Sequence, residues 1–267
     1  MSSYRPHSVR TASHPRSQKL LPATISRVHT PAPHLRQITL TLPTPCIFKP
    51  GQWVDLHLPS LPQPGGFTII TPPTDEGTEF ELSVREAAGN PAAAWLWRAE
   101  EEVSGREVHV RVGGSFVFPP PGVQRTEVEK VVFVAGGVGV NPFLSMMAWI
   151  RREKERGGDW GGVDVRLLWS TKRGEWSYLD RVERDCGKEG ARLFETGRGP
   201  DGMESLEGWE VQRRRLDVED LKRATERRHS KVLAYVCGPK GFEDSCIDAL
   251  VNEVGIDTER VFSERWW

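Results

Sequence analysis

The sequence predicts two domains: an antiparallel β-barrel over residues 20–121, followed by an α/β domain with a doubly wound parallel sheet over residues 127–267. Three observations lead to this prediction. A length of 267 residues suits about two domains. The first part of the chain alternates apolar and polar residues with period two, as half-buried strands do. The last part alternates apolar runs with helically spaced apolar residues, as parallel strands joined by helices do.

The composition excludes several classes of protein. Hydrophobic residues at 37% and charged residues at 27% allow a buried core and exclude disorder throughout the chain. No apolar run approaches the roughly 20 residues of a membrane-spanning helix, so no membrane span is expected. The four cysteines form no CxxC pair, which predicts neither a metal site nor a disulfide framework and favours a reducing compartment. The net charge of −1 gives no basic excess to bind nucleic acid.

The N-terminal residues 1–19 are rich in Ser, basic, and free of acidic residues. Two interpretations stay open. One is a transit segment, with mitochondria as the first choice of location and the cytoplasm otherwise, and the other is a disordered basic tail. Pro6 and Pro15 disfavour the amphipathic helix of a transit segment. No apolar run of the kind found in signal peptides is present, so secretion is not expected.

Six short strands separated by Gly and Pro turns make up the predicted barrel. They are expected at residues 23–28, 35–42, 52–58, 67–71, 79–85 and 107–112. In the second strand Ile38, Leu40 and Leu42 share one face, as a half-buried strand requires. One helix, residues 91–99, is expected to interrupt the strands, with Pro91 suited to its first turn.

The second domain begins after the three prolines 119–121. Its first strand is predicted at residues 130–135, buried on both faces, and its first helix at residues 142–152. Further strands are predicted at residues 163–169, 191–195, 231–237 and 261–262, and further helices at 217–227 and 241–254. Residues 196–230 are interpreted as an insertion that carries one helix.

A glycine-rich loop, residues 135–142 (AGGVGVNP), joins the first parallel strand to the first helix. The glycines permit a tight turn and let a ligand lie against the backbone, and amides at a helix start attract phosphate. Asn141 stands where an N-cap would be. The pattern predicts a phosphate site, and the alternative is a tight turn without a ligand. No acid ends the second strand to bind a ribose, so a nucleotide is expected to bind differently from the usual dinucleotide fold.

A second strand-to-helix turn follows residues 231–237 as Cys237-Gly238-Pro239. Two such turns at the carboxyl ends of parallel strands would line one crevice. Cys237 would then lie at the tip of its strand and face the ligand. The alternative is that Cys237 is a buried small hydrophobic residue.

Together these motifs resemble, in the family's order, the ferredoxin–NADP reductase superfamily of flavoprotein reductases, and within it the branch called oxidoreductase NAD-binding domain-containing protein. The resemblance covers residues 20–267. Residues 48–54 are similar to the barrel strand that the family enters through a Pro-Gly-Gln turn. Residues 65–68 (GGFT) occupy the slot of the flavin motif Arg-any-Tyr-Ser/Thr, and residues 82–85 match the next flavin strand. Residues 261–266 resemble the C-terminal strand, which ends in an acid and then an aromatic residue.

The resemblance implies a barrel of the flavin-binding type and an α/β domain of the ferredoxin reductase type. The implied activity is hydride transfer from NAD(P)H to FAD, with electrons passed to an unidentified acceptor such as a haem protein or a quinone. The implied catalytic residues are Thr68, Cys237 and Glu264. The implied cofactor contacts are Phe67, Thr68, Ser83, Val84, Arg85, Asn90, Gly136, Gly137, Val138, Gly139, Pro142, Thr171, Cys237, Gly238, Pro239 and Trp266. Trp266 would cover the flavin ring, or else serve in packing.

Departures from the family's pattern weaken the expected flavin site. Gly65 stands where the family has the Arg that pairs with the flavin phosphate, and Phe67 lacks the hydroxyl of Tyr. Alanines 92–94 stand where hydroxyl groups would help, although Arg85 or amides near Asn90 could compensate in part. FAD is therefore expected to bind weakly. The alternative function is a nucleotide-binding scaffold or sensor that has lost flavin binding and redox turnover.

The choice between NAD and NADP rests on basic residues near the second and third parallel strands. Arg198 follows the third strand, where members that prefer NADP place basic groups, and Lys172 and Arg173 are nearby candidates. The alternative is a solvated charged loop that contacts no ligand. Both interpretations stay open.

Overall fold

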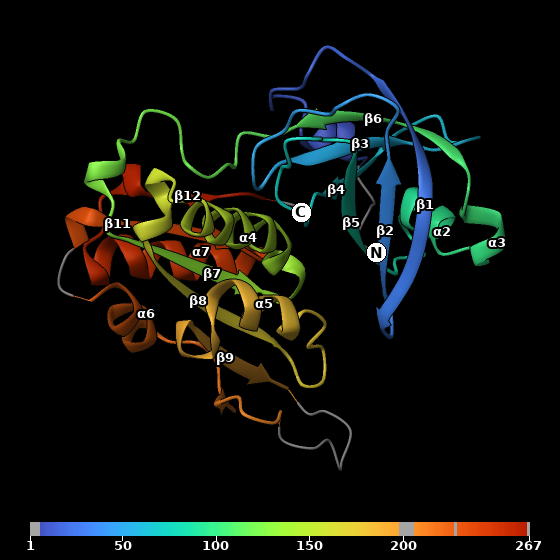
Figure 1. Cartoon of the computed structure of the whole chain (residues 1–267). Coiled ribbons are helices and arrows are strands. Elements are labelled where there is room, and N and C mark those ends of the chain that lie inside the picture. The colour runs from blue at the N-terminus through green and yellow to red at the C-terminus, as the bar shows by residue number, and fades with distance from the viewer. Residues whose placement is uncertain (1–5, 198–205, 227–228, 266–267) are drawn as a thin grey trace. The chain divides into compact units, whose positions relative to one another are not determined.

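The computed structural model describes residues 6–197, 206–226 and 229–265 (Figure 1). The chain divides into two compact units, Met1–Phe118 and Pro119–Trp267, and each contains one six-stranded sheet. The first sheet is antiparallel and the second parallel, which confirms the predicted fold class. Within the described ranges, no helix has the length and apolar character needed to cross a bilayer.

The antiparallel sheet forms the barrel, with the strand order β4-β3-β6-β1-β2-β5. A bridge between Ile69 and Leu82 joins the two outer strands and closes it. The strands are β1 (Leu21–Ala32), β2 (Leu35–Thr41), β3 (Trp53–His57), β4 (Gly65–Thr68), β5 (Glu79–Arg85) and β6 (Glu107–Gly113). All six predicted strands are present, with the predicted ends for β5 and ends shifted by a few residues for the other five.

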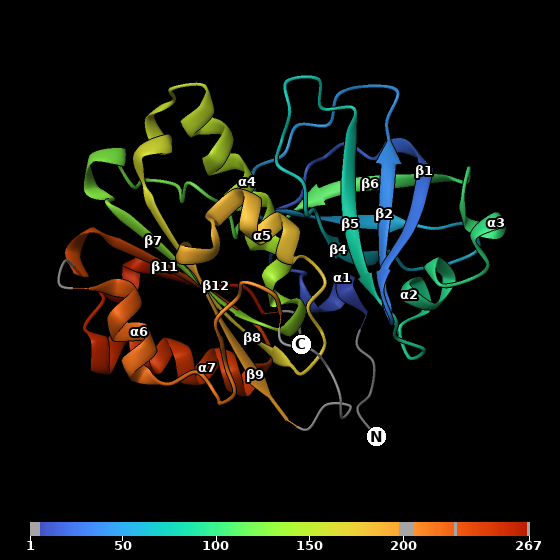
Figure 2. The same ribbon diagram turned by 60° about the horizontal axis from the view of Figure 1, so that its bottom comes forward.

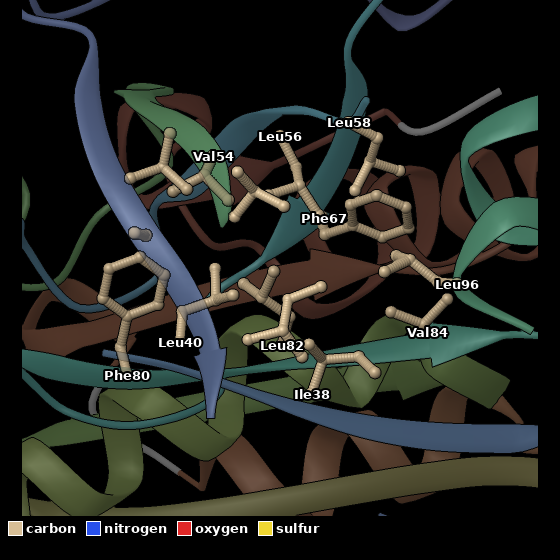
Figure 3. Packing of buried hydrophobic residues seen from close by; sticks show 14 of the residues in the cluster. Ile38, Leu40, Val54, Leu56, Leu58, Phe67, Phe80, Leu82, Val84 and Leu96 are labelled. Carbon is tan, nitrogen blue, oxygen red and sulfur yellow. The ribbon is translucent and has the colours of Figure 1, made fainter. Parts of the chain in front are cut away.

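Alternate side chains of these strands fill a single hydrophobic core (Figure 3). Side chains of a strand point to opposite faces in turn, so the period-two pattern of the sequence becomes an inner and an outer face. The inner face of β2 carries Ile38 and Leu40, and that of β3 carries Val54 and Leu56. Helix α2 (Pro91–Leu96) packs against this core through Leu96.

The helix predicted over residues 91–99 ends three residues earlier, and a second short helix that was not predicted follows it. Helix α2 ends at Leu96, and α3 (Glu100–Val103) begins after Ala99. Ala99 adopts φ −53° and ψ 143°, an extended conformation that interrupts the helical hydrogen-bond pattern.

Residues 6–19 pack on the outer face of the barrel, which corrects the disordered tail that was one of the two interpretations of residues 1–19. They include α1 (His7–Arg10), which the sequence did not predict. His7 is 2% exposed, and its ring meets the Trp53 ring edge-on at 4.5 Å between centres. A Cβ on Gly66 would lie 2.1 Å from His7 Nδ1, so His7 can sit here only above a glycine. The transit-segment interpretation stays a prediction.

Asp55 lies beneath this segment, on the outer face of β3, and is fully buried. Its Oδ2 accepts hydrogen bonds from Arg16 and Arg111, each at 2.8 Å, and Nε2 of His7 lies 3.4 Å from Oδ1. Burial alone would raise the pKa of Asp55, but the hydrogen bonds from His7, Arg16 and Arg111 outweigh it and hold the pKa well below its ordinary range. The Arg16 guanidinium also lies over the Trp53 ring. The N-terminal segment therefore supplies charges that the barrel needs.

The parallel sheet of the second unit has the strand order β10-β9-β8-β7-β11-β12. The chain enters the sheet at β7, in the middle, and adds β8, β9 and β10 on one side. It then crosses over and adds β11 and β12 on the other side. The order therefore reverses between β7 and β11, the switch point at which doubly wound sheets bind ligands. The strands are β7 (Lys130–Gly136), β8 (Asp164–Lys172), β9 (Ala191–Thr196), β10 (Val211–Gln212), β11 (Val232–Cys237) and β12 (Val261–Ser263).

Helices cover both faces of this sheet (Figure 2). One face carries α4 (Asn141–Glu155) and α5 (Leu179–Cys186), and the other carries α6 (Val218–Thr225) and α7 (Lys240–Asp248), which continues as a π-helix over Ala249–Val254. Phe133 of β7 stacks on Phe143 of α4 at 4.9 Å, while its neighbours Val132 and Val134 join the cluster under α6 and α7. A strand covered on both sides explains the continuous apolar run of β7.

We predict that Arg16→Gln lowers the free energy of unfolding at neutral pH by about 1–3 kcal/mol, because it removes a charged partner from a buried carboxylate. Urea unfolding measures the change. The loss should shrink as the pH falls below about 4, the ordinary pKa of Asp, because the unfolded chain takes up a proton there and the folded Asp55 follows at lower pH.

The matched control is Arg27→Gln, which changes an exposed arginine of β1. It should alter the free energy of unfolding by no more than about 0.5 kcal/mol. Equal, small effects of the two substitutions would show that residues 6–19 do not stabilise the barrel.

Candidate functional site

Two backbone turns meet at the carboxyl ends of β7 and β11, the switch point of the parallel sheet. Gly137–Val140 form a single 3₁₀ turn between β7 and α4. A Cβ on Gly139 would lie 2.1 Å from the carbonyl oxygen of Cys237, and one on Gly238 would lie 3.0 Å from Cα of Gly136. Only glycine permits these approaches, so the sequence holds the two turns backbone to backbone.

The first turn of α4 carries no side-chain cap and no acidic residue. Asn141 is the first residue of the helix, with φ −52° and ψ −51°, rather than the N-cap that the sequence indicated. Its side chain is buried, and its Oδ1 has no hydrogen-bond partner among the described residues. Amides near the start of a helix attract anions. A buried carbonyl oxygen such as Asn141 Oδ1 is stabilised by a hydrogen-bond donor. A ligand that carries both phosphate and hydroxyl or amide groups fits this arrangement.

The tip of the turn is open to the outside. Val138 is 42% exposed, although it is a large apolar residue, and Gly137 has φ +56°. Pro142, the second residue of α4, is buried. Thr171 of β8 is also buried, and its carbonyl oxygen accepts a hydrogen bond from Thr196 Oγ1 at 3.2 Å. Of these predicted nucleotide contacts, Val138 is therefore the side chain that solvent reaches.

Cys237 ends β11 and is shielded from solvent. Its Sγ lies 3.8 Å from the backbone oxygen of Glu264, so the structure brings two of the predicted catalytic residues together. Burial raises the pKa of the Cys237 thiol well above its ordinary value, and the carboxylates of Glu264 and Glu243 raise it further. A raised pKa favours the neutral thiol over the thiolate, which is the nucleophilic form of cysteine.

Glu264 follows β12 and is buried, as the predicted site requires. Trp266 and Arg198 lie outside the described residues. Lys172 is exposed at the end of β8, and Arg173 is half-buried beside it. Within the described parts of the chain, no group of His, Cys, Asp or Glu residues could hold a metal ion.

The barrel residues that the resemblance assigns to a flavin do not form a matching site. Phe67 is 7% exposed and packs in the barrel core near Leu58 and Leu96 (Figure 3). Phe67 is paired with Val54 across β3 and β4, so both side chains point to the inner face. Its ring is therefore not presented for stacking on a flavin, contrary to what the resemblance implies.

The space beside Gly65, where the family has an arginine, is filled. A Cβ on Gly65 would lie 2.4 Å from Cβ of Ala92 and 2.6 Å from the Phe67 ring. Helix α2 thus packs directly against the position from which a guanidinium would reach a flavin phosphate. The family's arginine is absent at this position, and Ala92 and the Phe67 ring occupy the space that its side chain would need.

The amides at the start of α2 already have a partner. Asn90 is the N-cap, and its Oδ1 accepts hydrogen bonds from the amides of Ala92 and Ala93 at 3.1 and 3.3 Å. Thr68, Ser83 and Val84 are buried, while Arg85 is exposed at the end of β5. These residues do not fit a tightly held flavin, whereas the uncapped start of α4 fits a phosphate.

Comparison with known proteins points to the same unit. The model of the oxidoreductase NAD-binding domain family matches residues 133–248. Oxidoreductase NAD-binding domain-containing protein 1 of Xenopus laevis is 30% identical, over 98% of this chain and 84% of that protein. The human protein of the same name is 29% identical over 98% of this chain and 84% of its own length.

Solved structures share the fold at low sequence identity. The cytochrome b5 reductase domain of Ulva prolifera nitrate reductase superposes with a TM-score of 0.70 at 15% identity, over 92% of this chain and 98% of that one. An Amycolatopsis cytochrome P450 reductase superposes with a TM-score of 0.69 at 21% identity, over 95% of this chain and 71% of that one. At these identities the likeness establishes the fold.

We predict that Gly139→Ala disrupts the switch point, since its Cβ would collide with the Cys237 carbonyl. The free energy of unfolding should fall by about 1–3 kcal/mol, as for other overpacked sites. NADH binding should weaken at least tenfold because the two turns must move apart. Urea unfolding and titration calorimetry measure the two effects.

Gly241→Ala is the matched control, because Gly241 lies in α7 with no atom within 4 Å of an added Cβ. It should leave both quantities close to those of the wild type. A Gly139→Ala protein that is as stable as wild type and binds NADH equally well would contradict the role given to this contact.

Proposed function

Because the chain belongs to the oxidoreductase NAD-binding domain-containing protein 1 family, with a ferredoxin reductase-like fold, we propose that it is an NAD(P)H-dependent oxidoreductase that uses a loosely held flavin. The observation that carries the proposal is the backbone contact between Gly139 and Cys237, beside the uncapped start of α4. This arrangement lies at the switch point, where the fold binds nucleotides.

The residues of the second unit have distinct parts in this proposal. Amides of the Gly137–Val140 turn, which leads directly into α4, hold the pyrophosphate, and Asn141 Oδ1 accepts a hydrogen bond from a hydroxyl or amide group of the nucleotide. Glu264 is buried beside Cys237, where its carboxylate would stabilise the positive charge that a nicotinamide acquires when its hydride passes to a flavin, and the neutral Cys237 thiol would not compete with it.

A flavin, when bound, would supply the change from a two-electron donor to one-electron acceptors. The core position of Phe67, the filled space beside Gly65 and the Asn90 cap all support an easily lost flavin. The loss of one charge-assisted contact alone weakens binding by about 1.5–3 kcal/mol, or roughly ten- to a hundredfold. A haem protein is the proposed acceptor, in line with the cytochrome b5 and cytochrome P450 reductases that share the fold.

The same three barrel observations favour a second candidate function. A chain that binds NAD(P)H but cannot hold a flavin would act as a nucleotide-binding scaffold or sensor. The two functions share the nucleotide site and differ only in whether the barrel supports electron transfer.

We predict that the purified protein carries less than one flavin per chain and that NADH reduces FAD only when FAD is added in excess. The measurement is the anaerobic loss of flavin absorbance after NADH is added, with calorimetry of NADH binding alongside. Gly139→Ala serves as the control, since it should abolish catalysed reduction of FAD.

The outcomes separate the two candidates. NADH binding without reduction of added FAD would favour the scaffold or sensor. A protein that purifies with one tightly held flavin per chain would show that the Gly65 and Asn90 arrangement does not weaken the barrel site. Absence of binding by both NADH and NADPH would refute both functions.

A further inference from the structure

A buried tryptophan on β8 holds the glycine turn from the side opposite β11. The indole Nε1–H of Trp169 donates a hydrogen bond to the carbonyl oxygen of Gly137 at 3.0 Å. Trp169 of β8 pairs with Ala135 of β7. Its indole therefore reaches beyond Ala135 to the carbonyl of Gly137, two residues later in the chain. Packing in the core would not by itself require the indole N–H to donate its hydrogen bond to this particular carbonyl.

The carbonyl that Trp169 holds controls the orientation of the next amide. The peptide that joins Gly137 to Val138 is planar and trans, so its C=O and its N–H point in opposite directions. Anchoring the Gly137 oxygen on Trp169 therefore directs the Val138 N–H away from β8. Val138 forms the exposed tip of the turn, so this amide belongs to the part of the turn that a ligand reaches.

The hydrogen bond adds to two constraints that the turn already has, the 3₁₀ turn of Gly137–Val140 and the contact between Gly139 and Cys237. Glycine populates positive and negative φ about equally, and Gly137 sits at φ +56°. A Cβ added at Gly137 would meet no heavy atom within 4 Å, so no neighbour there restricts the choice of φ. The indole hydrogen bond fixes the direction of the Gly137 carbonyl.

Trp169 is in turn fixed by a second tryptophan. The Trp176 ring meets the Trp169 ring edge-on, with 5.0 Å between centres and 87° between planes. Trp176 Nε1–H donates to Glu195 Oε1 at 2.8 Å, and Glu195 lies on β9. The chain of contacts Trp169–Trp176–Glu195 thus ties the glycine turn to the third strand of the sheet.

We propose that Trp169 is a positioning residue for the pyrophosphate of the nucleotide, acting through the Gly137–Val138 peptide. Trp176 and Glu195 hold the Trp169 ring in the orientation that this requires. The inference rests on the proposed function, since it assumes that a pyridine nucleotide binds at the turn.

The test removes the N–H of Trp169 and keeps an aromatic ring. Trp169→Phe should raise the dissociation constants for NADH and for ADP-ribose by the same factor, about fivefold, as expected for the loss of one hydrogen bond. The two ligands share the pyrophosphate, and only NADH carries nicotinamide. A purely structural role would lower the melting temperature without producing this matched loss.

Trp160→Phe is the matched control, because Trp160 lies in the turn that precedes β8, at the other end of the strand. It should leave both dissociation constants unchanged. If Trp169→Phe fails to fold, replacement of Trp169 by 3-benzothienylalanine, which has sulfur in place of the indole N–H, gives the same comparison in a ring of nearly the same shape.

Wild-type affinities in the Trp169 variant would overturn the inference and leave the proposed function intact. A loss for NADH without a loss for ADP-ribose would also overturn it, since the effect would then lie at the nicotinamide. A wild-type protein that binds neither ligand would refute the proposed function, and the inference with it.

Discussion

The second unit depends on the contact between Gly139 and the backbone of Cys237. A Cβ on residue 139 would lie 2.1 Å from the carbonyl oxygen of Cys237, too close for any side chain. The turns after β7 and β11 can therefore touch only because residue 139 is glycine. This contact brings the start of α4 beside the Cys237–Gly238 turn. The proposed nucleotide site lies at this contact, and the buried Cys237 and Glu264 lie next to it.

Helices and strands whose buried residues recur at regular spacing could be predicted from the sequence. Strand β5 was predicted with its observed ends, since Phe80, Leu82 and Val84 alternate with polar residues. The continuous apolar run of β7 likewise predicted a strand covered on both faces. The glycine turn could be placed because several glycines between a buried strand and an amphipathic helix are typical of a phosphate-binding turn.

Elements whose stability comes from distant contacts were missed. Helix α5 is only eight residues long and has three apolar residues, Leu179, Val182 and Cys186, and β10 is only two residues long, so neither gives a long periodic pattern. Helix α1 exists because His7 fits above Gly66, a contact between distant parts of the chain that no local pattern reveals. The inward direction of Phe67 depends on a strand pairing that only the folded barrel defines. The Asn90 cap, by contrast, is a local contact before Pro91 that a cap signal in the sequence could have revealed.

The seating of His7 and Arg16 on the barrel also limits where the chain can be cut. A peptidase acting at residue 19 would strip the cover from Trp53 and leave Arg111 as the one remaining cation of the three basic groups around Asp55. Loss of residues 6–19 would therefore uncover a buried carboxylate and its tryptophan neighbour on the outside of the barrel.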